Sequence, residues 1–238
     1  MYNFKTKSNF VRIVEKRTVS KSEIQELNKR YKTLSLIDRI TALYKDFDES
    51  EMMLTSSFAA TSAVLLKLFS EVNTNQIIYF IDTGYHFDET ISYKKQLSET
   101  YNLNVKSVRA LAHEHEFTNK DKTWSENPDL CCSINKVKPL EVIKNKYTVW
   151  VSGLMEWQSD HRNSLDIFEQ RGDILKFYPL VDISKKQRDD FIKAHDLPFH
   201  PLVSKGYHSI GCQHCTVPGE DRSGRWNNNP KTECGLHL

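Results

Sequence analysis

Apolar residues recur at helical spacing near the start of the chain. Between residues 24 and 34 they return every three or four positions, which predicts an amphipathic helix. Ser20 and Glu23 precede this series with the spacing of a capping box, so the helix is expected to begin beside Ser20. A similar pattern predicts a second short helix over residues 36–44.

Further along, short apolar runs have the composition of buried strands. Residues 77–81 (IIYFI) are uninterrupted and rich in β-branched side chains, as in a parallel strand covered on both faces. The other expected elements are strands at 52–54, 105–108 and 147–152, and helices over 64–69 and from Gly84 to about Tyr101. Because strands alternate with helices, the pattern predicts an α/β fold with a parallel sheet flanked by helices.

Polar turns follow three of the expected strands. They are Thr55-Ser56-Ser57, Asp82-Thr83-Gly84 and Ser152-Gly153. In parallel sheets, ligands bind beyond the carboxyl ends of the strands. The three turns are therefore expected to meet at one rim and to form a binding site there.

Glycine and proline are distributed unevenly along the chain. Gly84 is the first glycine, Pro128 is the first proline, and five of the eight glycines lie at or beyond residue 206. This distribution predicts a regular first half and a loop-rich C-terminal segment. The expected division is an N-terminal helical segment (1–50), an α/β domain (51–205) and a C-terminal tail (206–238).

Charge and hydropathy exclude two classes of partner. The 33 basic and 31 acidic residues give a net charge of +2, which argues against a dedicated nucleic-acid-binding protein. No stretch approaches the ~18 apolar residues of a membrane span, and the first twelve residues do not resemble a secretion signal. We therefore expect a cytoplasmic protein with neither nucleic acid nor membrane as partner. A small anionic substrate needs only a few local cations and remains compatible with this charge.

Four of the five cysteines form two close pairs, Cys131-Cys132 and Cys212/Cys215. In a reducing compartment such pairs indicate metal ligands rather than disulfides. Structural zinc sites space paired ligands by two to four residues, whereas adjacent cysteines can each reach a different iron of a larger cluster. The spacing favours a [4Fe–4S] cluster. Zinc and unmetallated buried cysteines are the alternatives.

The fifth cysteine, Cys234, stands in a polar tail between Lys231 and His237. Nearby cations raise the thiolate fraction of a cysteine, so Cys234 is a candidate nucleophile. The alternative is an exposed thiol without a function. A single thiol cannot supply both electrons of a reduction, so a reductive reaction at Cys234 implies an external dithiol partner.

Several motifs together resemble the assimilatory sulfonucleotide reductases, from about Thr55 to Leu238. They are Cys131-Cys132 with Lys136–Leu140, Leu197–Leu202, Gly206-Tyr207, Ser209–Cys212, Cys215-Thr216, Gly224–Trp226 and the tail from Lys231 to His237. The resemblance implies an adenine-nucleotide α-hydrolase-like (PP-loop) fold. It also implies a [4Fe–4S] cluster on the four paired cysteines, Cys234 as the nucleophile, and thioredoxin or glutaredoxin as the reductant.

The implied reaction agrees with the chemistry of the residues. The Cys234 thiolate attacks the sulfuryl group of adenylyl sulfate, AMP leaves, and a dithiol releases sulfite from the S-sulfocysteine. The implied substrate-binding residues are Ser56, Ser57, Phe58, Asp82, Thr83, Gly84, Lys136, Arg162, Arg222, Arg225 and His237. The same reaction on 3′-phosphoadenylyl sulfate is the second candidate.

Four positions depart from the family pattern. Ala59 replaces a glycine, Met155 and Glu156 replace two arginines, and Asn135 replaces an arginine beside Lys136. Other functions left open are an ATP-dependent sulfur transferase of the PP-loop fold and a zinc-stabilised non-enzymatic module. The sulfur transferases carry a Ser-Gly-Gly-Lys-Asp-Ser loop where this chain has residues 57–62 (SFAATS), which counts against that alternative. A homo-oligomer also stays open.

Overall fold

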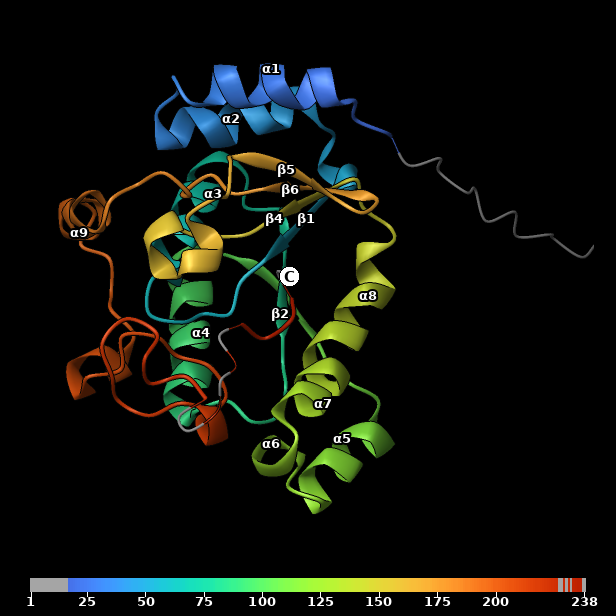
Figure 1. Cartoon of the computed structure of the whole chain (residues 1–238). Coiled ribbons are helices and arrows are strands. Elements are labelled where there is room, and N and C mark those ends of the chain that lie inside the picture. Colours follow the sequence, from blue (N-terminus) through green and yellow to red (C-terminus); the bar gives the residue numbers. More distant parts are fainter. Residues whose placement is uncertain (1–16, 227–228, 230, 232, 237–238) are drawn as a thin grey trace, which may run out of the picture.

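A computed structural model describes residues 17–226, 229, 231 and 233–236 (Figure 1). Within them the strands form one six-stranded sheet in the order β3-β2-β1-β4-β6-β5. All neighbouring pairs are parallel except β5 and β6, which are antiparallel. The strands are β1 (Met52–Thr55), β2 (Ile77–Ile81), β3 (Asn104–Val108), β4 (Val149–Val151), β5 (Phe168–Arg171) and β6 (Ile174–Phe177). The predicted α/β fold class is confirmed, with one antiparallel edge strand.

Helices cover both faces of the sheet, with α4 and α8 on opposite sides (Figure 1). The α-helices are α1 (Lys21–Tyr31), α2 (Leu36–Asp46), α3 (Ser62–Val72), α4 (Asp88–Thr100), α5 (Ala112–Lys120), α6 (Thr123–Glu126), α7 (Pro128–Cys132), α8 (Lys138–Lys144) and α9 (Lys185–Ala194). Short 3-10 helices lie at Glu49–Glu51, Glu156–Gln158, Asp160–Arg162, Pro201–Lys205 and Gln213–Cys215, and a π-helical turn, η2, at Ser133–Val137. In the described part of the chain, no helix has the length and apolar character that crossing a bilayer would demand.

The N-terminal helices begin where the sequence predicts. Ser20 caps α1 and forms a capping box with Glu23. The two helices lie together at one end of the molecule (Figure 1) and bury Tyr31, Ile40 and Leu43 in the same hydrophobic core as the sheet. The described part of the 1–50 segment therefore has no core separate from that of the α/β domain.

The β5–β6 hairpin was absent from the sequence expectations, which foresaw a parallel sheet only. Its two strands are joined by Gly172 and Asp173, a turn signal that could have revealed it. Lys176 interrupts the apolar pattern of β6 although its side chain is buried, with the ammonium group 4.7 Å from the centre of the Trp150 ring. A cation–π interaction with this ring stabilises the ammonium group, so a buried strand can carry a lysine at this position.

Helices α7 and α8 are joined by η2, so that residues 128–144 form one helical stretch with a π turn inside it. Such turns are rare and occur frequently at functional sites. The cysteine pair 131–132 ends α7 and Lys136 lies within the π turn.

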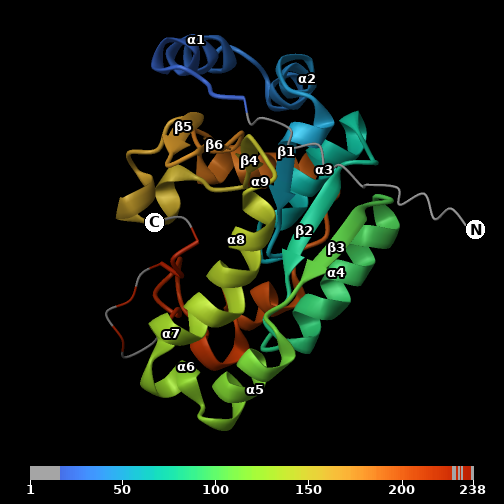
Figure 2. The same cartoon turned by 90° about the vertical axis from the view of Figure 1, so that its right-hand side faces the viewer.

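The segment after residue 206 is loop-rich, as predicted. A bridge between His86 and Cys212 ties it to the end of β2. The final described residues run along α7 and α8 (Figure 2), where Lys231 pairs with Asp129 and Leu236 packs beside Leu140. The C-terminal segment is therefore held against residues from the middle of the sequence, namely His86, Asp129 and Leu140.

Candidate functional site

A cavity of about 540 Å³ opens beyond the carboxyl ends of β1 and β4. β1 and β4 are neighbours in the sheet. The chain continues from β1 to β2 on one side of this pair and from β4 to β5 and β6 on the other side. Sheets of α/β proteins bind their ligands at such a point, where the strand order reverses. The turns Thr55-Ser56-Ser57 and Ser152-Gly153 line the cavity, as expected. The third predicted turn, Asp82-Thr83-Gly84, does not belong to its lining.

The loop between β1 and α3 is held by its own side chains. The Ser56 hydroxyl accepts a hydrogen bond from the Phe58 amide (3.2 Å), and Ser62 accepts one from the Ala59 amide (2.9 Å). Phe58 takes the left-handed conformation (φ 49°), and its buried ring packs edge-on against Phe80. Phe58, predicted to bind substrate, thus anchors the loop. Ala59 is not among the described residues with positive φ, so alanine in place of glycine causes no backbone strain there.

The Asp82-Thr83-Gly84 turn faces the cysteines. The Asp82 carboxylate accepts hydrogen bonds from Arg109 (2.6 and 3.0 Å) and from the Gly84 amide (3.1 Å). Burial raises the pKa of Asp82, but these donors lower it more, so the group stays ionised. The Thr83 hydroxyl lies 3.3 Å from the Cys212 sulfur. The substrate-binding role of this turn stays a prediction, and its observed contact is with the cysteine cluster.

The structure brings Cys131, Cys132, Cys212 and Cys215 together. Cys131, Cys132 and Cys212 are buried and Cys215 is partly exposed. Burial, followed by the charges of the neighbouring thiolates, raises the pKa of Cys131 to about 12 and that of Cys215 to about 11. Four thiolates held this close repel one another, and bound metal with positive charge would relieve that repulsion.

A zinc ion and an iron–sulfur cluster make different geometric demands on four thiolates. Zinc needs its ligands to converge at about 2.3 Å from one point. Nowhere in residues 17–226, 229, 231 and 233–236 do three His, Cys, Asp or Glu side chains converge in that way. An iron–sulfur cluster accepts thiolates that are farther apart, because each binds a different iron. The four cysteines supply the donors that the predicted [4Fe–4S] cluster requires, and the choice between this cluster and zinc stays a prediction.

Lys136 lies between the cysteine cluster and the cavity. Burial lowers its pKa, but the thiolates of Cys212, Cys132 and Cys234 raise it more, so the net shift is upward. The side chain also lines the cavity. A fixed positive charge thus stands beside both the proposed metal ligands and the proposed nucleophile.

Arg162, Arg222 and Arg225 all line the cavity, in agreement with the predicted cationic site. Arg225 packs its guanidinium group 4.5 Å from the Trp226 ring centre, and its buried Nε finds no acceptor among the described residues. Arg162 is 6% exposed and binds the carboxylate of Glu233 through two hydrogen bonds of 2.9 Å. The sequence analysis missed Glu233, although a glutamate directly before the nucleophile candidate was the available signal.

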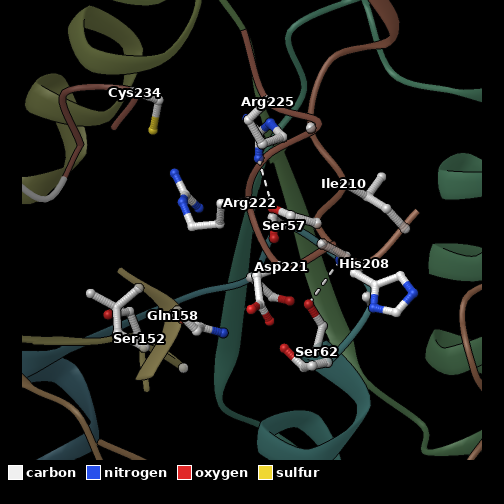
Figure 3. A pocket seen from close by; sticks show the side chains of 18 of the residues that line it. Ser57, Ser62, Ser152, Gln158, His208, Ile210, Asp221, Arg222, Arg225 and Cys234 are labelled. Carbon is white, nitrogen blue, oxygen red and sulfur yellow. Dashed lines mark hydrogen bonds between the residues drawn. The ribbon is translucent and has the colours of Figure 1, made fainter. Parts of the chain in front are cut away.

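Cys234 is partly exposed and lines the cavity together with these arginines. Its sulfur and the Arg222 guanidinium group project into the same space (Figure 3). His237, the other predicted residue of the tail, lies outside the described residues. A thiol in a pocket lined with cations can approach an electrophile that carries negative charge.

The remaining departures from the family pattern find structural explanations. Glu156 is exposed and absent from the cavity lining, so it places no negative charge on a bound anion. Met155 is fully buried in the core. Asn135 is buried and donates hydrogen bonds to the Thr118 hydroxyl (3.0 Å) and the Cys131 carbonyl (3.1 Å). The Asn135 side chain therefore helps to fix the backbone at Cys131.

Comparison with known proteins places this geometry in context. Residues 51–218 match the phosphoadenosine phosphosulfate reductase domain. A Bacillus thuringiensis (strain Al Hakam) protein named adenosine 5′-phosphosulfate reductase is 36% identical over 232 residues, covering 94% of this chain and 96% of that protein. A protein of the same name from Halalkalibacterium halodurans is also 36% identical, covering 90% of this chain and 96% of its own length.

Solved structures give the same fold. The crystal structure of phosphoadenylyl-sulfate reductase from Candida auris, a phosphate complex, has a TM-score of 0.74 at 26% identity and covers 85% of this chain and 100% of that one. The FMN adenylyltransferase of Candida glabrata has a TM-score of 0.54 at 14% identity, covering 83% and 73% of the two chains. The second likeness concerns the fold alone.

Proposed function

Because the chain belongs to the phosphoadenosine phosphosulfate reductase domain family, we propose that it reduces adenylyl sulfate to sulfite and AMP in sulfate assimilation. The bacterial relatives that match it over nearly their whole length carry the name adenosine 5′-phosphosulfate reductase, which favours adenylyl sulfate over its 3′-phospho form. The observation that carries the proposal is a partly exposed thiol, Cys234, in a cavity lined by Lys136, Arg222 and Arg225.

The reaction proceeds in two steps. The Cys234 thiolate attacks the sulfur atom of the sulfuryl group, a sulfur–sulfur bond forms, and the bond from that sulfur to the bridging phosphate oxygen breaks. AMP leaves with the electron pair of the broken bond, and the enzyme holds an S-sulfocysteine. One thiol of an external dithiol then attacks the Cys234 sulfur and sulfite departs. The second thiol closes a disulfide in the donor and regenerates Cys234.

The cations of the cavity stabilise the charge of substrate and leaving group. Adenylyl sulfate carries negative charge on its phosphate and sulfate oxygens, and the phosphate gains charge as AMP departs. Lys136 and Arg225 supply donors for these oxygens, and a guanidinium group can bind two of them at once. His86 also lines the cavity, but burial lowers its pKa to about 4, so it is neutral at pH 7 and adds no charge.

Cys131, Cys132, Cys212 and Cys215 would hold the [4Fe–4S] cluster. Cys131 and Cys132 on the 128–144 helical stretch, and Cys212 and Cys215 on the C-terminal segment, would then be joined through bound iron, with negative charge beside Lys136. Lys136 then holds its ammonium group between the cluster ligands and the thiol of Cys234. Thr83 and Asn135 support the ligands Cys212 and Cys131 through the contacts described above.

The test uses protein purified without oxygen and both sulfonucleotides. Sulfite release is measured with reduced thioredoxin as the donor, and glutaredoxin is compared with it. Cys234→Ser should keep iron, labile sulfide and AMP binding but release no sulfite. Wild-type turnover by this variant would remove Cys234 from the mechanism, and a colourless protein containing one zinc would refute the cluster. Equal rates with the two nucleotides would contradict the preference for adenylyl sulfate.

A matched experiment without reductant isolates the first step. Wild-type protein incubated with adenylyl sulfate should gain a sulfonate-sized mass on its C-terminal peptide, whereas Cys234→Ser should not. A cytoplasmic location follows from the need for a reduced dithiol donor, and we propose it on that ground.

A further inference from the structure

Glu233, the residue before the proposed nucleophile, is a buried carboxylate. Only 4% of its surface is exposed. It accepts hydrogen bonds from Arg162 Nε and Nη2 (both 2.9 Å), from Arg222 Nη2 (3.2 Å) and from the Ser159 hydroxyl (3.1 Å). Burying a carboxylate is costly unless it is paired and hydrogen-bonded, and this one is both.

The partners of Glu233 come from a different part of the chain. Ser159 and Arg162 belong to the segment after β4, at the carboxyl edge of the sheet, whereas Arg222 lies 11 residues before Glu233 in the loop-rich C-terminal segment. Arg162 is itself held in place, because its Nη1 donates to the Gln158 side chain. The carboxylate therefore binds a preformed guanidinium group on the domain that also carries the cavity.

The local charges do not cancel. Two guanidinium groups surround one carboxylate, so the cluster of Glu233, Arg162 and Arg222 keeps one positive charge next to the cavity. Both arginines line the cavity, but Arg162 binds Glu233 through Nε and Nη2, whereas Arg222 donates a single hydrogen bond to Glu233 and projects into the same space as Cys234 (Figure 3). The pairing thus assigns different tasks to two arginines that the family resemblance treats alike.

We propose that Glu233 is a positioning residue, which docks the C-terminal tail on Arg162 and Arg222 and thereby holds the Cys234 thiol in the cavity. This inference rests on the proposed function, since the position of the thiol matters only if the thiol reacts. Glu233 also lines the cavity, but both of its carboxylate oxygens are engaged by Arg162 and Arg222. It acts on the next residue of the chain by fixing the backbone from which Cys234 projects.

The tail has a second ion pair that serves as an internal control. Lys231 pairs with Asp129 of α7; only 7% of the Lys231 side chain is exposed, but 82% of the Asp129 side chain is, and the Lys231 ammonium group also lies 5.6 Å from the Trp226 ring centre. Asp129→Asn therefore removes a carboxylate that water already solvates and leaves the cation with its aromatic contact. Exposed pairs contribute little because water solvates both partners when they separate, whereas breaking a buried pair leaves an uncompensated charge. Docking should therefore depend on Glu233 and hardly on Asp129.

The first experiment measures docking without any turnover. Iodoacetamide is added to anaerobic, nucleotide-free protein, and modification of Cys234 is followed by mass spectrometry of the C-terminal peptide. Glu233→Gln keeps the shape of the side chain and removes its charge, and we expect alkylation roughly tenfold faster, because a buried charge pair has lost one partner. Glu233→Asp keeps the charge and should restore most of the protection. Asp129→Asn should stay within about twofold of the wild type.

The second experiment separates positioning from nucleotide binding. In a single turnover with adenylyl sulfate and no reductant, Glu233→Gln should form the Cys234 adduct about tenfold more slowly. Its dissociation constant for AMP should be unchanged or lower, because the cavity has lost a negative charge. A residue that only stabilised the fold would weaken AMP binding and adduct formation together.

Three results would overturn the proposal. They are an unchanged alkylation rate in Glu233→Gln, an equal acceleration in Asp129→Asn, and faster adduct formation in Glu233→Gln. The last result would mean that the carboxylate competes with substrate for the arginines. Failure of the proposed function would be recognised separately, as wild-type protein that forms no adduct although its alkylation rates respond to Glu233.

Discussion

Gly84 gives a sharp test of how the β2 turn and the cysteine cluster fit together. It has φ +73°, and a Cβ built on it would lie 2.6 Å from Cε1 and 2.8 Å from Nε2 of His115. Gly84→Ala therefore adds two costs, a left-handed conformation and a steric clash. Gly172 in the β5–β6 turn has φ +59° with nothing within 4 Å of its Cβ position, so Gly172→Ala adds only the first.

The difference between the two variants measures the clash. A left-handed alanine costs about 1–2 kcal/mol, and overpacking adds about 1–3 kcal/mol. His115 can relieve the clash only by moving, but its Nδ1 lies 3.1 Å from the buried Asn135 side chain and its ring packs 4.7 Å from the Tyr85 ring. We therefore expect a loss of about 3 kcal/mol for Gly84→Ala and about 1 kcal/mol for Gly172→Ala.

Thermal unfolding, monitored by circular dichroism, measures these losses of stability. At about 2–4 °C per kcal/mol for a chain of this size, Tm should fall by about 9 °C for Gly84→Ala and about 3 °C for Gly172→Ala. Because Asn135 also donates to the Cys131 carbonyl, Gly84→Ala should retain less iron after anaerobic purification. Equal Tm shifts and equal iron contents in the two variants would refute the coupling between the turn and the cysteine pair.

Three further predictions concern the cluster, the tail and the N-terminal helices. Cys212→Ser removes one of the four thiols and should lose iron and soluble yield, whereas full iron content would contradict the ligand assignment. Burial raises the pKa of Glu233, but Arg162 and Arg222 lower it more, so the pKa in the folded protein lies below the usual 4.5. The stability that Glu233 contributes is therefore complete above about pH 4.5 and is lost as the pH falls through this lower pKa. The difference in unfolding free energy between wild type and Glu233→Gln should therefore be constant near neutral pH and shrink in acid, and a difference that grows in acid would be inconsistent with this pairing. Arg39, 4% exposed, donates to the Tyr31 and Pro179 carbonyls and to Asp182. Arg39→Met should cost about 3 kcal/mol because it leaves buried acceptors unpaired, whereas Arg30→Met at an exposed pair should cost under about 1 kcal/mol in urea unfolding.

Local sequence predicted the elements whose signals are local. The capping box at Ser20 determines where α1 begins, and the uninterrupted run at 77–81 forms β2 as expected. The expected burial on both faces is wrong, because Ile77, Tyr79 and Ile81 are only partly buried. The β5–β6 hairpin escaped prediction because Lys176 broke the apolar pattern, and its contact with the Trp150 ring forms only in the folded protein. The domain boundaries at residues 50 and 205 stay predictions.

The candidate site was predicted in its residue types and only partly in its geometry. Ser56 and Ser57 line the cavity as expected, because a turn that follows a parallel strand lies at the carboxyl edge of the sheet. Phe58 directly follows the first predicted turn and Thr83 lies in the second, but their side chains face the core and Cys212 respectively, since successive residues of a turn point to different sides. Sequence position alone cannot select the side.

The sequence by itself determined the chemistry that is available, namely two pairs of thiols, a fifth thiol near the end, and several cations. These are properties of residue type and spacing, and they hold in any fold. Only the tertiary structure decided how the charges pair. Arg162 and Arg225 look equivalent in the sequence, yet Arg162 meets the buried carboxylate of Glu233, whereas the Nε of Arg225 has no hydrogen-bond partner in the part of the chain that the structure describes. The reason is that ion pairing depends on distance and on exclusion of water, and both arise when segments far apart in the chain are brought together.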